Sequence, residues 1–234
     1  METRCPSPSC NKSFSLSGFV PDKRNHYLGN CPVCGIRAKF RTTEALEAIE
    51  VAYRKKLARG GVTGGPEREA SFAPSLSVLV EDVRSLWNIG SIFRTADGAG
   101  FERIYLTGIC GSPPRKEIAK VSLGAEETVS WLYELNPLVV LESLKLSGVF
   151  ILGLEVSDDS TLLSTAIEEG SLSVPLCLVL GNEVSGLSPQ VMDVCDRICH
   201  LPMKGMKESL NVAVAFGIAA YLLSELDGTA VVES

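Results

Sequence analysis

The chain lacks any hydrophobic run long enough to cross a membrane. Its longest apolar stretch, from Val212 to Leu223, falls well short of the ~20 residues that a membrane-spanning helix needs. A signal-peptide pattern is also missing, because Met1 is followed at once by polar residues and cysteines. We therefore expect a cytoplasmic protein without a membrane partner, whose eight cysteines serve as thiols or metal ligands rather than disulfides.

The chain also lacks a net positive charge, although its basic residues are concentrated at one end. The 22 Lys and Arg residues against 28 Asp and Glu residues give a net charge of −6. Residues 1–70 contain 12 basic and 7 acidic residues, a net +5, which leaves −11 for residues 71–234. A basic front end would supply attraction to a polyanion such as RNA, although a segment of this length also reaches +5 by chance.

The composition changes along the chain and suggests three parts. Residues 1–42 are rich in Cys, Pro, Ser, Gly and Asn, a composition that cannot form a stable core without a staple. Apolar residues at helical spacing predict a helix from Thr43 to Arg59 with a basic C-terminal end. The glycine-rich run Gly60–Pro66 reads as a linker. We therefore expect an N-terminal module over residues 1–42, a basic helix and linker over 43–74, and a second domain over 75–234.

From Ser75 onward, short apolar strands alternate with helical patterns. The predicted strands are Leu76–Val80, Arg103–Leu106, Val149–Leu154, Leu176–Leu180 and Ile198–Leu201. The predicted helices are Ile89–Ala99, Pro137–Leu146, Thr161–Glu169, Pro189–Asp196 and a long final helix over Ser209–Leu226. This alternation is typical of an α/β domain with a mostly parallel sheet, whose functional loops follow the carboxyl ends of the strands.

Four cysteines of the N-terminal module form two close pairs. Cys5 and Cys10 are separated by four residues, and Cys31 and Cys34 by two, with Gly35 next to the second pair. Zinc takes four thiolates in a tetrahedron, and two close pairs supply that set. A redox pair or unrelated core thiols would also explain the pattern, but a cytosolic setting favours a structural zinc ion in a zinc-ribbon-like module.

Three polar segments each follow a predicted strand. The first places Asn88 and Arg94 at the start of a helix, and the third places Ser209 and Asn211 at the mouth of the apolar final helix. Ser209 is also a suitable N-cap for that helix. The second segment, Leu178–Ser188, contains two glycines that let the backbone come close to a ligand.

In this order, the three segments resemble the SPOUT superfamily of methyltransferases, and specifically its TrmH-like branch of RNA 2′-O-ribose methyltransferases. The resemblance extends from about Ser75 to Leu226. The matching motif residues are Asn88, Gly90 and Arg94; Gly181, Asn182, Glu183, Gly186 and Leu187; and Pro202, Met203, Gly205, Ser209, Leu210 and Asn211. The N-terminal module departs from the commoner extension of this branch, which leaves open whether the substrate is transfer RNA or ribosomal RNA.

The resemblance implies S-adenosylmethionine as cofactor, a C-terminal trefoil knot and a homodimer formed through the knot region. The implied cofactor-binding residues are Leu154, Leu180, Gly181, Asn182, Leu201, Met203, Ser209 and Leu210. The implied catalytic residues are Asn88, Arg94, Glu183, Ser209 and Asn211. In this family the counterpart of Arg94 acts at the ribose 2′-hydroxyl, in a site built partly by the other subunit.

Other functions also fit parts of the pattern. The chain could be a non-catalytic RNA- or ribosome-binding protein that retains the methyltransferase fold, or a zinc-ribbon adaptor whose second domain mainly dimerises. The complete cofactor segments together with Asn88 and Arg94 argue against both, because a binding protein needs no such set. Methylation of a base nitrogen fits less well, since the first segment has the ribose-type pattern.

Overall fold

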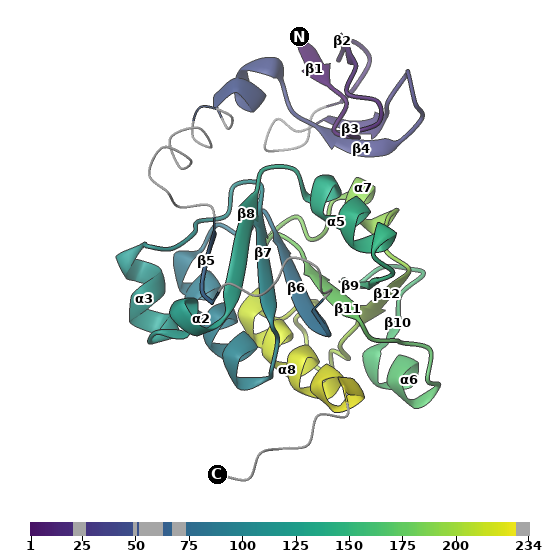
Figure 1. Ribbon diagram of the computed structural model, residues 1–234. Coiled ribbons are helices and arrows are strands. Elements are labelled where there is room, and N and C mark those ends of the chain that lie inside the picture. Colours follow the sequence, from purple (N-terminus) through teal and green to yellow (C-terminus); the bar gives the residue numbers. More distant parts are fainter. Residues whose placement is uncertain (21–26, 49–50, 52–62, 67–73, 228–234) are drawn as a thin grey trace, which may run out of the picture.

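A computed structural model describes residues 1–20, 27–48, 51, 63–66 and 74–227 of the chain (Figure 1). Figure 1 shows a central sheet with helices against both of its faces and the small N-terminal module beyond one end of the strands. This arrangement confirms the predicted α/β fold with a mostly parallel sheet. None of the helices in the described ranges combines the length and apolar character needed to cross a membrane.

The N-terminal module consists of two small hairpins. Strands β1 (Glu2–Arg4) and β2 (Ser13–Ser15) pair antiparallel, as do β3 (Tyr27–Asn30) and β4 (Arg37–Phe40). Their small core consists of Cys5, Leu16, Tyr27, Cys31, Ala38 and Phe40. Residues 43–48 are helical, as predicted, whereas most of the remaining residues of the predicted helix, up to Arg59, lie outside the described residues.

The described chain contains one eight-stranded sheet, in the order β10-β12-β9-β11-β6-β7-β8-β5. Its strands are β5 (Thr63–Gly64), β6 (Leu76–Glu81), β7 (Arg103–Thr107), β8 (Ser130–Glu134), β9 (Phe150–Leu154), β10 (Thr161–Leu162), β11 (Leu176–Leu180) and β12 (Arg197–His200). Only β5 runs antiparallel to its neighbour. Strands β6, β7 and β8 extend to one side, and the chain then crosses over to β9 on the other side of β6.

The helices of the second domain connect these strands and cover the two faces of the sheet (Figure 1). They are α2 (Leu86–Gly98), α3 (Lys116–Ser122), α4 (Ala125–Thr128), α5 (Pro137–Leu146), α6 (Leu163–Glu168), α7 (Pro189–Met192) and α8 (Val212–Ser224), followed by a short 3-10 turn, Glu225–Asp227. On one face α2, α6 and α8 pack on the sheet, and on the other α5 and α7 do so.

Strand β11 shows why the sheet is buried on both faces. Leu178 and Leu180 belong to the hydrophobic core with α2 and α8, whereas Cys177 and Val179 belong to the core with α5 and α7. Successive side chains of a strand point to opposite faces, so a strand covered on both sides reads as a continuous apolar run. The run over residues 176–180 therefore predicted this strand correctly.

Several predicted boundaries were wrong, for local reasons. The final helix begins at Val212 instead of Ser209, because Asn211 is its N-cap and its Oδ1 accepts the N–H groups of Ala213 and Val214. The helix predicted over Pro189–Asp196 ends at Met192. Asp196 instead bonds β9, since its carboxylate accepts the N–H of Ile151.

Other differences concern short edge elements and strands of mixed polarity. Thr161 and Leu162 form β10 beside β12, so the helix predicted from Thr161 starts at Leu163. Thr63 and Gly64, within the predicted linker, form β5 at the opposite edge. Strand β8 and helices α3 and α4 were not predicted. In β8, polar and aromatic residues obscure the apolar run by which the other strands were found.

Candidate functional site: a pocket at the carboxyl ends of three strands

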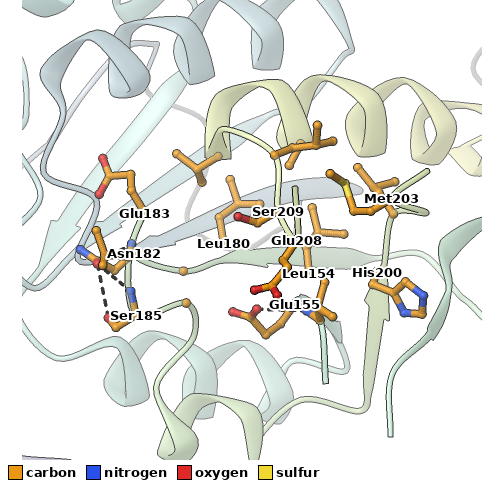
Figure 2. A pocket seen from close by; sticks show the side chains of 18 residues that line it. Leu154, Glu155, Leu180, Asn182, Glu183, Ser185, His200, Met203, Glu208 and Ser209 are labelled. Carbon is orange, nitrogen blue, oxygen red and sulfur yellow. Dashed lines mark hydrogen bonds between the residues drawn. The ribbon is translucent and has the colours of Figure 1, made fainter. Parts of the chain in front are cut away.

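A cavity of about 310 Å³ opens beside the carboxyl ends of β9, β11 and β12 (Figure 2). Ligands of open α/β sheets bind at this edge, near the point where the strand order reverses. The cavity is lined by Leu154, Glu155, Val156, Leu180, Gly181, Asn182, Glu183, Val184, Ser185, Gly186, His200, Leu201, Met203, Glu208, Ser209, Leu210, Val212 and Ala215. In Figure 2, Asn182 and Glu183 lie at one end of this space, and His200 and Met203 at the other.

The lining contains every residue that the sequence analysis predicted to bind the cofactor. These eight residues are Leu154, Leu180, Gly181, Asn182, Leu201, Met203, Ser209 and Leu210. They come from three segments that are far apart in the sequence, and parallel strands bring the segments together because their carboxyl ends share one edge of the sheet.

The segment after β11 forms a closed loop. A Cβ atom at Gly181 would lie 2.2 Å from the backbone carbonyl carbon of Gly186, so only glycine fits there. The backbone N–H groups of Asn182 and Gly186 each donate to the carbonyl of the other, over 3.1 and 2.9 Å. The Asn182 side-chain oxygen then accepts the N–H groups of Val184 and Ser185. The loop is therefore held in one shape before any ligand binds.

Glu183 joins this loop to the start of α2. Its carboxylate accepts the N–H groups of Arg84 and Ser85 and the side-chain amide of Asn88, over 3.0 to 3.2 Å. Asn88 in turn accepts the side-chain amide of Asn211, over 3.1 Å. Burial opposes ionisation of Glu183, but these hydrogen bonds outweigh it and lower the pKa of its carboxyl below the ordinary value. Glu183 and Ser209 line the cavity, and Asn88 and Asn211 lie beside it through their bonds to Glu183 and to each other. Four of the five predicted catalytic residues are therefore at or beside the cavity.

Arg94, the fifth predicted catalytic residue, does not line the cavity. It is exposed on α2, and within the described chain its side chain makes no hydrogen bond or ion pair. Arg94 lies six positions after Asn88, which places the two side chains about 120° apart around the helix. Trp87 and Gly98, at spacings of seven and four residues from Arg94, share its face of α2.

Three titratable side chains of the lining were not predicted as ligands: Glu155, His200 and Glu208. Glu155 directly follows β9, and its carboxylate accepts the N–H of Leu187 over 2.8 Å. His200 ends β12, and its Nδ1 lies 2.9 Å from the Ser160 hydroxyl. The positions of Glu155 and His200 at the carboxyl ends of parallel strands were the signal that could have found these two residues.

The charge of the cavity is one-sided. Its lining includes the acidic residues Glu155, Glu183 and Glu208, and no lysine or arginine is among the described lining residues. A phosphate group would therefore find no cation in the lining, whereas a ligand that carries positive charge would find three carboxylates.

The four predicted zinc ligands lie together in the N-terminal module. The sulfur atoms of Cys5, Cys10, Cys31 and Cys34 all lie within 4.8 Å of one another. The Cys5–Cys34 and Cys10–Cys31 sulfur distances are 3.6 and 4.0 Å, close to the ~3.8 Å between thiolates that bind zinc tetrahedrally at ~2.3 Å. Burial opposes ionisation of Cys31, but the N–H groups of Cys34 and Val33 lower the pKa of its thiol. This donor set fits zinc.

A buried carboxyl group, Glu81, lies behind the pocket at the end of β6. It is 4% exposed and accepts both the N–H and the hydroxyl of Ser188, over 2.9 and 2.5 Å. Burial raises the pKa of Glu81 to about 7, although the two bonds from Ser188 act against this shift. Ser188 follows the Asn182 loop, so Glu81 ties that loop to the neighbouring strand.

The fold and the site together define an α/β protein with a preformed, acidic ligand pocket at the carboxyl edge of a parallel sheet. Residues 75–221 match the SpoU rRNA Methylase family. The chain therefore belongs to the SpoU rRNA Methylase family, which confirms the resemblance found in the sequence.

Individual relatives agree with this assignment. The chain is 26% identical over 220 residues to the 23S rRNA (guanosine-2'-O-)-methyltransferase RlmB of Vibrio parahaemolyticus, covering 90% of this chain and 86% of the relative. It is 32% identical over 146 residues to an enzyme of the same name from Burkholderia sp, covering 62% of this chain but only 57% of the relative. A solved structure, the A. aeolicus TrmH/SpoU tRNA modifying enzyme, is 27% identical with a TM-score of 0.59, covering 76% of this chain and 85% of that one.

The raised pKa of Glu81 predicts a pH-dependent stability. The folded chain holds this proton from the ordinary pKa of 4.5 up to about 7, so the stability that depends on it is complete below pH 4.5 and is lost as the pH rises to about 7. Between pH 5 and 8, we expect the free energy of unfolding of the unsubstituted chain to fall by up to about 3 kcal/mol relative to Glu81→Gln. Urea unfolding at both pH values measures this difference.

The control is Glu142→Gln, which removes an exposed carboxylate from α5. This variant should keep the pH dependence of the unsubstituted chain. Equal pH dependence of Glu81→Gln and the unsubstituted chain would show that Glu81 does not titrate in this range.

Proposed function

We propose that this protein transfers a methyl group from S-adenosylmethionine to a ribose 2′-hydroxyl of a transfer or ribosomal RNA. The observation that carries the proposal is that three segments of a SpoU rRNA Methylase family member meet around one pocket. Relatives named as 23S rRNA 2′-O-methyltransferases and a tRNA modifying enzyme support both RNA classes. A non-catalytic RNA-binding protein remains the alternative.

The pocket suits a ligand with the chemistry of S-adenosylmethionine. A sulfonium and an ammonium group are both positive, and the lining offers three carboxylates with no opposing cation among the described residues. Leu154, Leu180 and Leu201 provide apolar surface for an adenine ring, and the backbone approach at Gly181 leaves room for a ligand. The bound cofactor supplies an electrophilic methyl group.

The protein's own contribution to the reaction is positioning and proton management. Attack of the 2′-oxygen on a methyl carbon is an in-line displacement, so holding the ribose in line lowers the barrier. Arg94 bridges the ribose and its phosphate, because a guanidinium donates hydrogen bonds and does not give up its proton. The proton of the hydroxyl then passes to phosphate or water. Glu183, Asn88 and Asn211 hold the loops in register through their hydrogen bonds.

The function requires a homodimer, since Arg94 lies outside the cavity of its own chain. Exposed apolar side chains support an interface beside it. Val214, Ile218 and Tyr221 on α8 are 52%, 44% and 58% exposed, and Trp87 on α2 is 55% exposed. A Cβ atom at Gly98 would lie 3.0 Å from the Tyr221 hydroxyl, so this stripe of α8 borders the face of α2 that carries Arg94. A second subunit that covers this surface would place its own pocket next to Arg94 of the first subunit. The proposal includes the C-terminal trefoil knot that the resemblance implies, with the dimer formed through the knot region.

A charge placed in this surface should separate the subunits. We expect Ile218→Glu to convert a dimer into a folded monomer, because an interface cannot accommodate an unpaired buried carboxylate. Sedimentation analysis of the purified chain measures the change. The matched control is Leu146→Glu on α5, a 91% exposed leucine outside this surface, which should leave the dimer intact. A monomeric unsubstituted chain would refute the dimer.

The N-terminal module binds one structural zinc ion through Cys5, Cys10, Cys31 and Cys34 and captures RNA outside the pocket. The sulfur geometry supports the metal, and the excess of basic residues in residues 1–70 supports RNA capture. Zinc would fix the two hairpins, whose common core is too small to be stable alone.

Zinc content tests the first part of this proposal. We expect one zinc per purified chain and a loss of most of it in Cys34→Ser, because a hydroxyl is a poor zinc ligand compared with a thiolate. Cys195→Ser is the control, since Cys195 lies in the second domain and a serine hydroxyl can keep its bond to the Val191 carbonyl. Elemental analysis that finds no zinc in the unsubstituted chain would contradict the site. If the module captures RNA, Cys34→Ser should also bind RNA more weakly, with a flatter salt dependence.

Substitution of Arg94 tests the catalytic proposal. Arg94→Lys should lower kcat at least about 100-fold, because lysine cannot bridge ribose and phosphate in the same geometry. Its affinity for S-adenosylmethionine should stay unchanged, since Arg94 does not line its own pocket. Calorimetric titration with S-adenosylmethionine and a methylation assay on RNA measure the two quantities. Arg115→Lys, on an exposed arginine at the start of α3, is the control.

The outcomes separate the possible functions. Saturable cofactor binding without methylation of any RNA would favour the non-catalytic RNA-binding protein. Loss of cofactor binding in Arg94→Lys would show that Arg94 supports the fold instead of the reaction.

A further inference from the structure

The N-terminal module contacts the second domain at the edge that carries the pocket. The Lys39 N–H donates to the side-chain oxygen of Gln190 on α7 over 2.9 Å, and the Asn136 side-chain amide donates to the Pro6 carbonyl over 2.7 Å. Ile36 packs against both the module core and the core under α5 and α7. Asn136 follows β8, so the module lies over the carboxyl ends of the strands, consistent with its place in Figure 1.

One of these contacts is an ion pair between Arg41, at the end of the module, and Asp82, which follows β6. Both side chains are largely shielded, at 22% and 18% exposed. Asp82 has a backbone φ of 56°, a left-handed conformation that is uncommon for residues other than glycine, although aspartate and asparagine adopt it more readily than most. Its other carboxylate oxygen accepts the Ile109 N–H over 2.9 Å. A Cβ atom at Gly108 would lie 1.9 Å from this oxygen, so the Asp82 carboxylate fits only beside a glycine.

Asp82 reaches the pocket in one further step. Its backbone carbonyl accepts the side-chain amide of Asn182 over 2.6 Å. The oxygen of the same Asn182 side chain accepts the N–H groups of Val184 and Ser185, and all three residues line the pocket. Two and three residues beyond Asp82, the N–H groups of Arg84 and Ser85 hold Glu183. The segment at Asp82 therefore holds the first two residues of the loop that borders the cavity, and Asn182 in turn holds the rest of the loop.

We propose that Arg41 is a positioning residue for the cofactor pocket, through which the N-terminal module holds the 182–186 loop in its binding conformation. This inference rests on the proposed function, because it concerns the affinity of that pocket for S-adenosylmethionine. Arg41 itself does not line the cavity. It acts by keeping the Asp82 carboxylate and backbone in place, and with them the Asn182 side chain. The module thus contributes to cofactor binding as well as to any capture of RNA.

The test compares Arg41→Ala with Arg37→Ala in the full-length protein. Arg37 is an exposed arginine on strand β4, and within the described chain no hydrogen bond or ion pair joins its side chain to the second domain. We expect Arg41→Ala to raise the Kd and the KM for S-adenosylmethionine about five- to tenfold, with kcat at saturating cofactor changed less than about twofold. Arg37→Ala should leave all three values unchanged, and Arg41→Lys should restore part of the affinity, since it keeps the charge but not the fork of the guanidinium.

A double-mutant cycle identifies the partner. Asp82→Asn removes the charge but keeps a residue type that tolerates the left-handed conformation, so it should weaken cofactor binding to a similar degree. If the two side chains act as one unit, the Arg41→Ala/Asp82→Asn double variant should bind no more weakly than either single variant. Zinc content, measured in every variant, should equal that of the unsubstituted chain.

The result that would overturn the inference is an unchanged cofactor Kd in Arg41→Ala and Asp82→Asn while the unsubstituted chain binds S-adenosylmethionine. Additive effects in the cycle would equally refute the coupling. Failure of the unsubstituted chain to bind the cofactor would instead refute the proposed function. If Arg41→Ala loses zinc or fails to fold, Asp82→Asn, which leaves the module unaltered, decides the question.

Discussion

The side chain of Asn182 connects the loops that follow two neighbouring strands, β6 and β11, at the edge of the sheet where the pocket lies. Its amide nitrogen donates to the carbonyl of Asp82 after β6, and its oxygen accepts from the loop after β11, the neighbouring strand. Asn182 is 7% exposed, and a buried amide must use its donors and acceptors or lose stability. The geometry of this one side chain therefore fixes the spacing of two loops. Gly181 and Gly186 permit this spacing because their backbones approach each other too closely for a side chain at position 181. The pocket, the Glu183 network and the contact with the N-terminal module all depend on that spacing.

Charge is divided between the parts of the molecule in a way that suits two ligands of opposite sign. The pocket is lined by Glu155, Glu183 and Glu208, whereas Arg94 and, among the described basic residues of the N-terminal module, Arg4, Lys12 and Arg37 are exposed. An acidic pocket beside an anionic RNA backbone would repel the phosphates. In the proposed function, this separation would keep the RNA backbone out of the cofactor space while long-range attraction brings the RNA to the protein. The net charge of −6 conceals this division.

The sequence predicted those parts of the fold and site that depend on local patterns. Continuous apolar runs identified β6, β7, β9, β11 and β12, and glycine and asparagine spacing identified the loops around the pocket. The paired cysteines predicted the cluster that the fold brings together. Features that depend on tertiary contacts were not predictable. Nothing near Arg41 in the sequence indicates Asp82 as its partner, and Glu155 gains its place only when β9 pairs with β11 and β12. Gly90 was recognised as a motif residue, but its reason is close packing: a Cβ atom there would lie 2.7 Å from the Ile118 carbonyl of α3.

In the proposed function, the position of Arg94 makes the single chain incomplete as a catalyst, because this side chain does not line the cavity. Because Gly90 packs against α3 and Asn88 is bonded to Glu183 and Asn211, α2 cannot rotate to bring Arg94 toward its own cavity. A rotation of about 120° would be needed, and it would expose Ile89, Ile92 and Phe93, each fully buried now. Burial of these side chains stabilises the fold by several kcal/mol, which is far more than one arginine contact would contribute. In the proposed function, the guanidinium of Arg94 therefore acts at the pocket of another subunit and not at that of its own chain. In that proposal, the N-terminal module supports the pocket indirectly, through Arg41 and Asp82, and a second subunit completes it on the side of α8, so that methyl transfer depends on both contacts being made.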